Sequence, residues 1–165
     1  MIKKLTIPVD HGNRNMKTTH FLFTTGLSST DRKPAGREDF LQTDGKFYVL
    51  SDKRIPYQRD KTQDERFSIL TRFAIAKELE RTGQVTEEDV VQVSLPIGVP
   101  PKHYAELAER YREYFLGDGK VQDLVYNGRI YHTCIQDVAV YPQAYAAMMT
   151  EGEKIRQIPK AVGLS

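Results

Sequence analysis

The decisive stretch of this sequence is Val9-Asp10-His11-Gly12-Asn13-Arg14-Asn15-Met16-Lys17-Thr18, close to the N-terminus. An apolar run from Ile2 to Val9 leads into the aspartate, and a second strand-like run extends from His20 to Thr25. A strand, a turn and a returning strand in this order bring one carboxylate, backbone N–H groups and one ammonium to a single point. A polyphosphate with its hydrated divalent metal binds to such groups. The stretch therefore predicts nucleotide binding.

The composition is that of one ordinary globular domain of 165 residues, of which 39% are hydrophobic and 28% charged. The 24 lysines and arginines against 22 acidic residues leave a formal net charge of only +2, which does not favour direct nucleic-acid binding. No segment has the length and apolarity of a membrane span, and no signal-peptide pattern is present. We therefore expect a cytoplasmic protein without membrane association.

Cysteine and histidine usage argues against a structural metal site. The single cysteine, Cys134, excludes an internal disulfide and lies in a strand-like pattern, so we interpret it as a packing residue. His20, His103 and His132 show no metal-ligand spacing, and we interpret His11 as a packed or turn-stabilising residue. The only metal expected is therefore one that arrives with a nucleotide.

Turn residues and hydrophobic periodicity predict strands and helices that alternate along the chain. The expected elements are strands at 3–10 and 17–25 joined by a turn at 12–15, a loop at 27–38, a hairpin at 39–50, a helix at 62–81, a strand at 89–95, a helix between Pro100 and Gly117, a hairpin at 121–135, a strand at 138–140 and a short helix at 142–150. Asp44-Gly45 and Asn127-Gly128 are expected as hairpin turns. Gly83 is expected to end the long helix, and Pro96 is expected to end the strand at 89–95. Helical spacing predicts a buried stripe at 69, 70, 73, 76 and 79 on the long helix, and an inner face at 104, 107, 108, 111 and 115 on the next helix.

This order of elements predicts an α/β fold in which helices cover both faces of a mixed sheet. The same order is found in the ribonuclease-H-like half of actin-type ATPases. We expect segment 31–61 to form a small inserted β-rich subdomain. Its basic residues at 53, 54, 59 and 61 are interpreted as a solvated surface, with an inter-subunit contact as the alternative.

Three pieces of the chain carry a resemblance to a known family. They are Val9–Thr18; Arg54–Tyr57 and Arg59–Thr62 before the long helix, with Val93–Pro100 after it; and Val138–Ala147. In this order, and over nearly the whole chain, they resemble the actin-like ATPases of bacterial plasmid segregation, the ParM/StbA type. The resemblance implies ATP and Mg²⁺ as cofactors.

The resemblance assigns the first loop to the phosphates. Asp10 would bind hydrated Mg²⁺ through water, or would simply bond turn N–H groups if the loop were structural. Gly12, Asn13 and Asn15 would let the backbone approach the phosphates, since glycine has no Cβ and asparagine tolerates left-handed geometry. An ordinary hairpin turn is the alternative interpretation.

Three further residues complete the implied site. Lys17 would contact the β- and γ-phosphates, or would be a solvated lysine on a strand face. Thr18 belongs to the same loop. Gln143 would orient the attacking water at the γ-phosphate, or would be an ordinary residue at a helix start.

The chain departs from the family pattern in two respects. His11 stands where an apolar residue is usual. A second phosphate loop of the Asp-x-Gly type and a glycine-rich adenosine-binding segment are not found. We therefore expect residues 1–165 to be the N-terminal half of an actin-like ATPase, either a truncated piece or a stand-alone half. It would be an ATPase only within a longer two-domain protein, and inactive alone.

Three functional hypotheses follow. The first is half of a filament-forming ATPase that self-associates to move plasmid DNA and contacts the DNA only through an adaptor protein. The second is a stand-alone, non-enzymatic interaction domain with a vestigial phosphate loop. The third is a relative of sugar or acetate kinases, which the segments at 59–62 and 96 disfavour.

Overall fold

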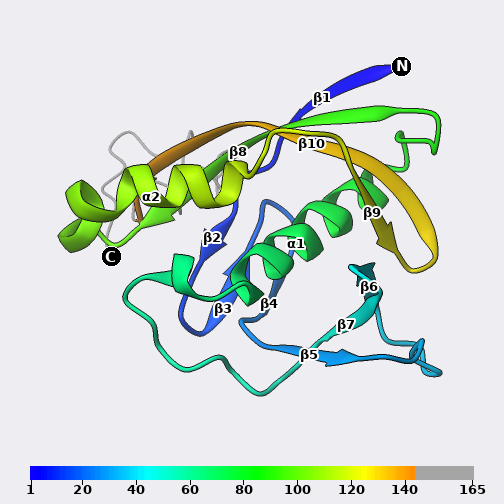
Figure 1. Ribbon diagram of the computed structural model, residues 1–165, viewed down its shortest axis with the longest axis horizontal. Coiled ribbons are helices and arrows are strands. Elements are labelled where there is room, and N and C mark those ends of the chain that lie inside the picture. The colour runs from blue at the N-terminus through cyan, green and yellow to red at the C-terminus, as the bar shows by residue number, and fades with distance from the viewer. Residues whose placement is uncertain (144–165) are drawn as a thin grey trace.

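Residues 1–143 are described by the computed structural model of this protein (Figure 1). Its strands are β1 (Ile2–Thr6), β2 (Asp10–His11), β3 (Asn15–Lys17), β4 (Leu22–Thr24), β5 (Leu27–Thr30), β6 (Phe40–Thr43), β7 (Lys46–Leu50), β8 (Val90–Val99), β9 (Gln122–Tyr126) and β10 (Arg129–Pro142). Its helices are α1 (Arg66–Thr82) and α2 (Tyr104–Leu116), each preceded by a short 3₁₀ turn, η1 (Lys61–Gln63) and η2 (Pro101–His103). The short helix expected at 142–150 lies largely outside the described residues.

The main sheet has seven strands in the order β1-β8-β10-β9-β6-β7-β5. Strand β8 is parallel to both β1 and β10, whereas the other neighbours are antiparallel. A second sheet of three antiparallel strands has the order β2-β3-β4. The expected mixed sheet with flanking helices is therefore confirmed.

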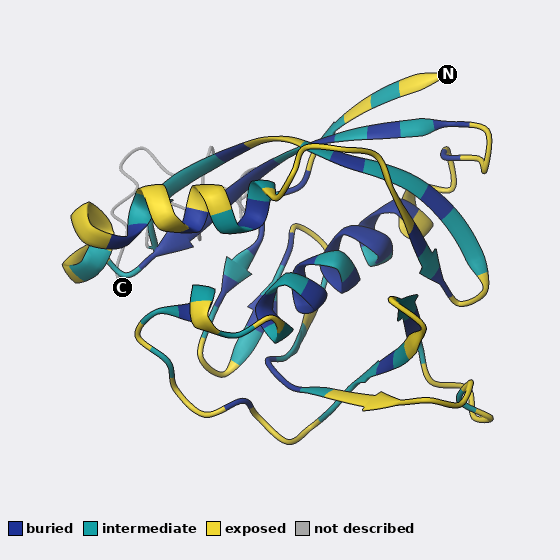
Figure 2. Ribbon diagram, in the orientation of Figure 1, coloured by how far each residue is buried: buried dark blue, intermediate teal, exposed yellow. Residues whose placement is uncertain are grey.

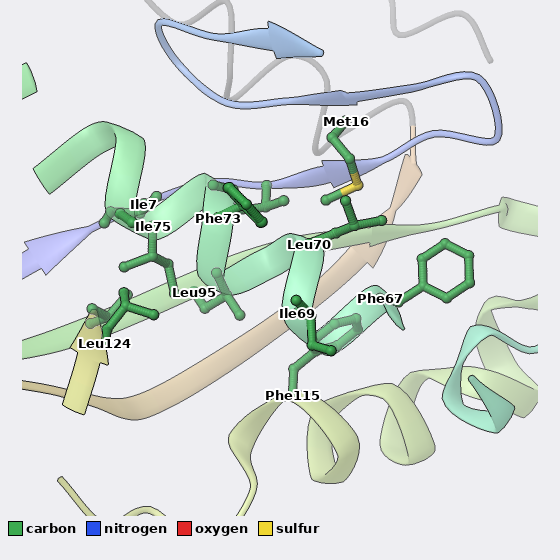
Figure 3. Packing of buried hydrophobic residues seen from close by; sticks show 14 of the residues in the cluster. Ile7, Met16, Phe67, Ile69, Leu70, Phe73, Ile75, Leu95, Phe115 and Leu124 are labelled. Carbon is green, nitrogen blue, oxygen red and sulfur yellow. The ribbon is translucent and has the colours of Figure 1, made fainter. Parts of the chain in front are cut away.

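Helix α1 carries the central apolar surface of the molecule, which Figure 2 shows as an almost continuous buried band. Its predicted stripe is confirmed: the side chains at 69, 70, 73, 76 and 79 are all buried. Figure 3 shows Leu70 beside Met16 of β3, and Ile69 above Phe115 of α2. Burying one such side chain contributes about 1.5–3 kcal/mol, so this helix holds the two sheets together.

Helix α2 packs directly against the start of α1. Of the predicted inner face at 104, 107, 108, 111 and 115, Leu107, Tyr111 and Phe115 are buried, Ala108 is half-buried and Tyr104 is exposed. The hydroxyl of Tyr114 donates to the Asp64 carbonyl at 2.6 Å, just before α1 begins. The two described helices therefore contact one another, and whether a helix covers the opposite face stays a prediction. No helix among residues 1–143 is long and apolar enough to cross a membrane.

The N-terminal strands differ from the predicted ones. The expected strand at 3–10 is interrupted at Pro8, which has no N–H for the ladder, and pairing resumes where Val9 bridges Ile97. The expected single strand at 17–25 is wrong, because the chain turns back between β3 and β4. The Thr18 hydroxyl accepts the Phe21 N–H at 3.1 Å in this turn, a local bond that competes with an extended strand.

Two other predictions about strands are wrong for reasons of pairing. Pro96 does not end β8, because it lies where the neighbouring β1 has already ended, and its carbonyl accepts the Val9 N–H at 2.9 Å. The predicted loop at 27–38 contains β5, a polar and mostly exposed edge strand that pairs with β7 through its backbone. Side-chain patterns carry little information about such a strand.

The remaining predictions about turns are confirmed. Asp44-Gly45 and Asn127-Gly128 all have positive φ, as a type I′ hairpin turn requires, and Gly83 ends α1 in the left-handed conformation. The strand expected at 138–140 is the continuation of β10 beyond a bulge. The β-rich part of segment 31–61 consists of β6 and β7, and β6 joins the main sheet by pairing with β9.

Candidate functional site

The site lies where parallel strands end at the same edge of the sheet. The chain around Val9 runs beside β8, and β10 runs parallel to β8 on its other side, so the carboxyl ends of the three meet. The first side chain after β10 is Gln143, whose Nε2 donates to Oδ1 of Asp10 at 3.3 Å. These two predicted site residues are 133 positions apart in the sequence, and the structure brings them into contact.

Lys17 stands beside Asp10 on the returning strand. The two residues are direct cross-strand partners in the β2–β3 hairpin, and such partners have Cβ atoms about 4.5–5.5 Å apart on the same face. The Lys17 ammonium is close enough to lower the pKa of the Asp10 carboxyl. The predicted carboxylate and ammonium therefore share one face of the hairpin.

The turn between Asp10 and Lys17 is tight and is held by hydrogen bonds from Thr25. A Cβ at Gly12 would lie 2.4 Å from the Asn15 carbonyl oxygen, so only glycine fits here. The buried Thr25 holds the turn at two points: its hydroxyl donates to the Gly12 carbonyl at 2.8 Å, and its N–H donates to the Arg14 carbonyl at 2.9 Å. The sequence carried no signal for the role of Thr25, which acts from outside the loop.

Asn13 and Asn15 differ in their exposure. Asn13 is exposed at the tip of the turn, whereas Asn15 is half-buried at the start of β3 and pairs with Thr24. Asn13 therefore lies in the predicted turn, whereas Asn15 begins the returning strand, and their contact with phosphates stays a prediction.

Lys61 is a site residue that the sequence misassigned to a solvated surface. Its side chain is only 5% exposed, its ammonium donates to the His11 carbonyl, and it lies 5.4 Å from the centre of the Phe67 ring. Burial lowers the pKa of this ammonium to about 8, although the nearby Asp10 carboxylate opposes the shift. No pattern within the basic segment distinguished Lys61 from its exposed neighbours.

Opposing effects act on the pKa of Asp10. Burial raises the pKa of the Asp10 carboxyl above its ordinary value, and the hydrogen bond from Gln143 and the charges of Lys61 and Lys17 only partly oppose this rise. The carboxylate is thus desolvated but surrounded by donors and cations. Such an environment suits a group that holds a hydrated cation through water.

His11 is packed, as predicted. It is 1% exposed, and its ring centroid lies 4.6 Å from that of Phe115. Its Nε2 lies 2.7 Å from the Thr71 hydroxyl, which itself donates to the Phe67 carbonyl, so Nε2 carries the proton and donates. Burial lowers the pKa of the imidazole well below its usual range, so His11 is an uncharged packing residue next to the loop.

Thr18 lies in a different hydrogen-bond network from the loop. Its buried hydroxyl donates to Oε1 of Glu78 on α1 at 2.6 Å. The same carboxylate accepts from the backbone N–H and the Nδ1 of His20, at 3.0 and 2.7 Å. Thr18 thus fastens the β3–β4 turn to α1, and we leave it out of the proposed site.

The donors present fit a phosphate group with a hydrated metal. No cluster of three or more histidine, cysteine, aspartate or glutamate side chains that could hold a metal ion occurs within residues 1–143. One carboxylate suits a metal held through water, and an ammonium suits phosphate oxygens as a point charge.

A comparison with family models decides the family. The model described as "Actin like proteins N terminal domain" matches residues 8–145. The chain belongs to this family. Among curated protein sequences, none matches it significantly.

Solved structures of actin-like proteins share the fold. The crystal structure of the apo psk41 ParM protein superposes with a TM-score of 0.66 at 14% identity, over 86% of this chain and 50% of that chain. The archaeal actin homolog Ta0583 gives 0.66 at 18% identity, over 91% and 49%. The Alp12 filament structure gives 0.60 at 17% identity, over 85% and 47%. This actin-like domain thus spans about half the length of the structures that it matches.

Proposed function

We propose that this actin-like domain supplies one side of an ATP–Mg²⁺ site in an ATPase that assembles into filaments and segregates plasmid DNA through an adaptor protein. One observation carries the proposal: the contact between Gln143 and Asp10 at the end of the parallel strands. It places the residue proposed to orient water beside the residue proposed to hold the hydrated metal. Lys17 lies across the same hairpin.

Solved structures with the same fold support the choice of ligand and assembly. A Ta0583 crystal structure is a complex with ADP, and an AlfA filament is bound to AMPPNP. Alp12 also forms a filament. Because these proteins are less than 25% identical to this chain, they lend support through the shared fold, and the residues above carry the argument.

The residues would act by positioning and by charge. Lys17 would neutralise phosphate oxygens, and Gly12 would let the backbone approach them. An ionised carboxylate only accepts hydrogen bonds, so the Gln143 amide nitrogen faces Asp10 and its oxygen is directed away to accept from a water. A bound magnesium ion would neutralise part of the negative charge of the phosphates. Phosphoryl transfer depends mainly on such positioning and electrostatic stabilisation.

An NMR titration of the 165-residue chain with ATP–Mg²⁺ tests the proposal. We expect weak binding, because the domain spans about half the length of its structural relatives, with shifted amide signals at 12–15 and at Gln143. Lys17→Ala should lower the affinity about tenfold or more, since a hydrogen bond to a charged group contributes about 1.5–3 kcal/mol. Lys46→Ala, which removes an exposed lysine at the start of β7, is the control.

Two outcomes would contradict the proposal. Equal affinities of the Lys17 and Lys46 variants would remove the hairpin from the site. Amide shifts that are absent at 12–15, or scattered over the surface, would favour the alternative of an interaction domain with a vestigial phosphate loop.

A further inference from the structure

The segment before α1 reaches the phosphate loop through one buried side chain. The Lys61 ammonium donates to the His11 carbonyl, one residue after Asp10 and one before Gly12. The side chain is 5% exposed and lies against the ring of Phe67, the second residue of α1. Thr25 and Lys61 therefore both donate hydrogen bonds to backbone carbonyls of the loop.

Helix α2 fixes the position of Lys61. The Tyr111 hydroxyl accepts the Lys61 backbone N–H at 3.1 Å. On the exposed side of the same helix, Arg110 forms an ion pair with Asp60, the residue that caps η1. These contacts join 60 and 61 to a helix 50 residues further along the chain.

We propose that Lys61 is a positioning residue of the phosphate loop, held in place by α2, so that a displacement of α2 is transmitted to the loop through the Lys61–His11 contact. The link of this inference to nucleotide rests on the proposed function, whereas the contact between Lys61 and the loop does not depend on it. Lys61 acts on the His11 backbone and need not touch a nucleotide.

Stability alone is a poor reason for this lysine. Removing an ammonium from water carries a large desolvation penalty, and replacing a whole buried ion pair by apolar residues is often neutral or stabilising. Methionine would fill similar space against Phe67 without the charge. A purely structural role would therefore be met by an apolar residue, whereas holding a carbonyl requires a donor.

Amide hydrogen exchange without nucleotide tests the inference directly. The Thr25 N–H donates to the Arg14 carbonyl, so its exchange reports opening of the loop. In Lys61→Met we expect this exchange to accelerate about ten- to a hundredfold, the range for a lost hydrogen bond to a charged group, while the amide of Val93 in β8 keeps its rate.

Lys77→Met is the matched control. Lys77 is a largely buried lysine that pairs with Asp39 at 2.8 Å and lies 5.3 Å from the centre of the Phe21 ring, and neither of these two partners belongs to the loop. It should leave the Thr25 exchange unchanged. Tyr111→Phe removes the hydroxyl that accepts the Lys61 N–H and donates to the Arg59 carbonyl, and it should accelerate the Thr25 exchange by a smaller factor. This second variant keeps the test decisive if Lys61→Met does not fold.

Unchanged Thr25 exchange in Lys61→Met, or equal acceleration in Lys77→Met, would overturn the inference. If Lys61→Met does not fold, unchanged Thr25 exchange in Tyr111→Phe would overturn it instead. The ATP–Mg²⁺ titration separates this result from the proposed function. If the loop loosens and ATP–Mg²⁺ affinity falls at least threefold, both stand. If the loop loosens while the affinity is unaffected, Lys61 positions the loop but the loop is not the nucleotide site.

Discussion

Gly12→Ala is the substitution for which the structure makes the sharpest prediction. Gly12 begins the turn between β2 and β3, and its carbonyl already accepts the Thr25 hydroxyl. An alanine Cβ would lie 2.4 Å from the Asn15 carbonyl oxygen, whereas real Cβ contacts stay beyond 3.0 Å. The nearby atom is backbone, so no side-chain rotation can relieve the clash, and the turn has to open.

The size of the effect follows from the bonds that opening the turn disturbs. The Thr25 hydroxyl bond to Gly12 and the Thr25 N–H bond to Arg14 close the turn at 2.8 and 2.9 Å. A typical hydrogen bond contributes about 0.5–1.5 kcal/mol, so weakening both lowers the free energy of unfolding by about 1–3 kcal/mol. At about 2–4 °C per kcal/mol, the unfolding midpoint should fall by several degrees.

Urea denaturation of the wild type and the variant measures this change. Gly36→Ala is the control, because the nearest atom to its Cβ is 3.9 Å away and no positive φ is involved. The control should differ from wild type by less than about 0.5 kcal/mol. A Gly12→Ala variant as stable as the Gly36→Ala variant would refute the idea that this turn is closed too tightly for a side chain.

Two further predictions concern α1. Glu78→Gln should lower the free energy of unfolding by about 1.5–3 kcal/mol in urea denaturation, because an amide cannot accept all the bonds from Thr18 and His20; no change would mean that the network is not formed. For Asp64, the hydrogen bonds from Arg66 hold the pKa of the carboxyl below its usual range, so its stabilising contribution is present above the unfolded-state pKa near 3.8 and is lost as the pH falls. The difference in the free energy of unfolding between wild type and Asp64→Asn should therefore be largest near neutral pH and disappear in strong acid. A difference that stays the same at every pH in denaturation experiments would contradict this.

Predictions that depend on neighbouring residues in the sequence succeeded. The turns at Asp44-Gly45 and Asn127-Gly128 are decided by the backbone freedom of the residues themselves, and the buried stripe of α1 by helical periodicity. Predictions that depend on a partner strand failed. Pro96 continues β8 because its neighbour has already ended, and β5 exists because β7 offers its backbone.

The candidate site divides in the same way. The sequence could predict that Asp10, Gly12 and Lys17 lie close together, because one hairpin contains all three. The alternation of side chains along a strand places cross-strand partners on one face. Lys61 was assigned to the surface because a basic segment of a chain is normally solvated. Tertiary packing against Phe67 and the His11 carbonyl buries this member of the segment.

The sequence by itself thus determined which residues form the loop, where α1 has its buried stripe and where the hairpins turn, because each of these depends on residues that are close together in the chain. The contact of Gln143 with Asp10 and the support of the loop by Thr25 and Lys61 were decided by tertiary structure alone. The physical reason is that parallel strands have no local connection. Their ends meet only when β8 is paired on both sides, and no pattern within one strand records which partner it will find.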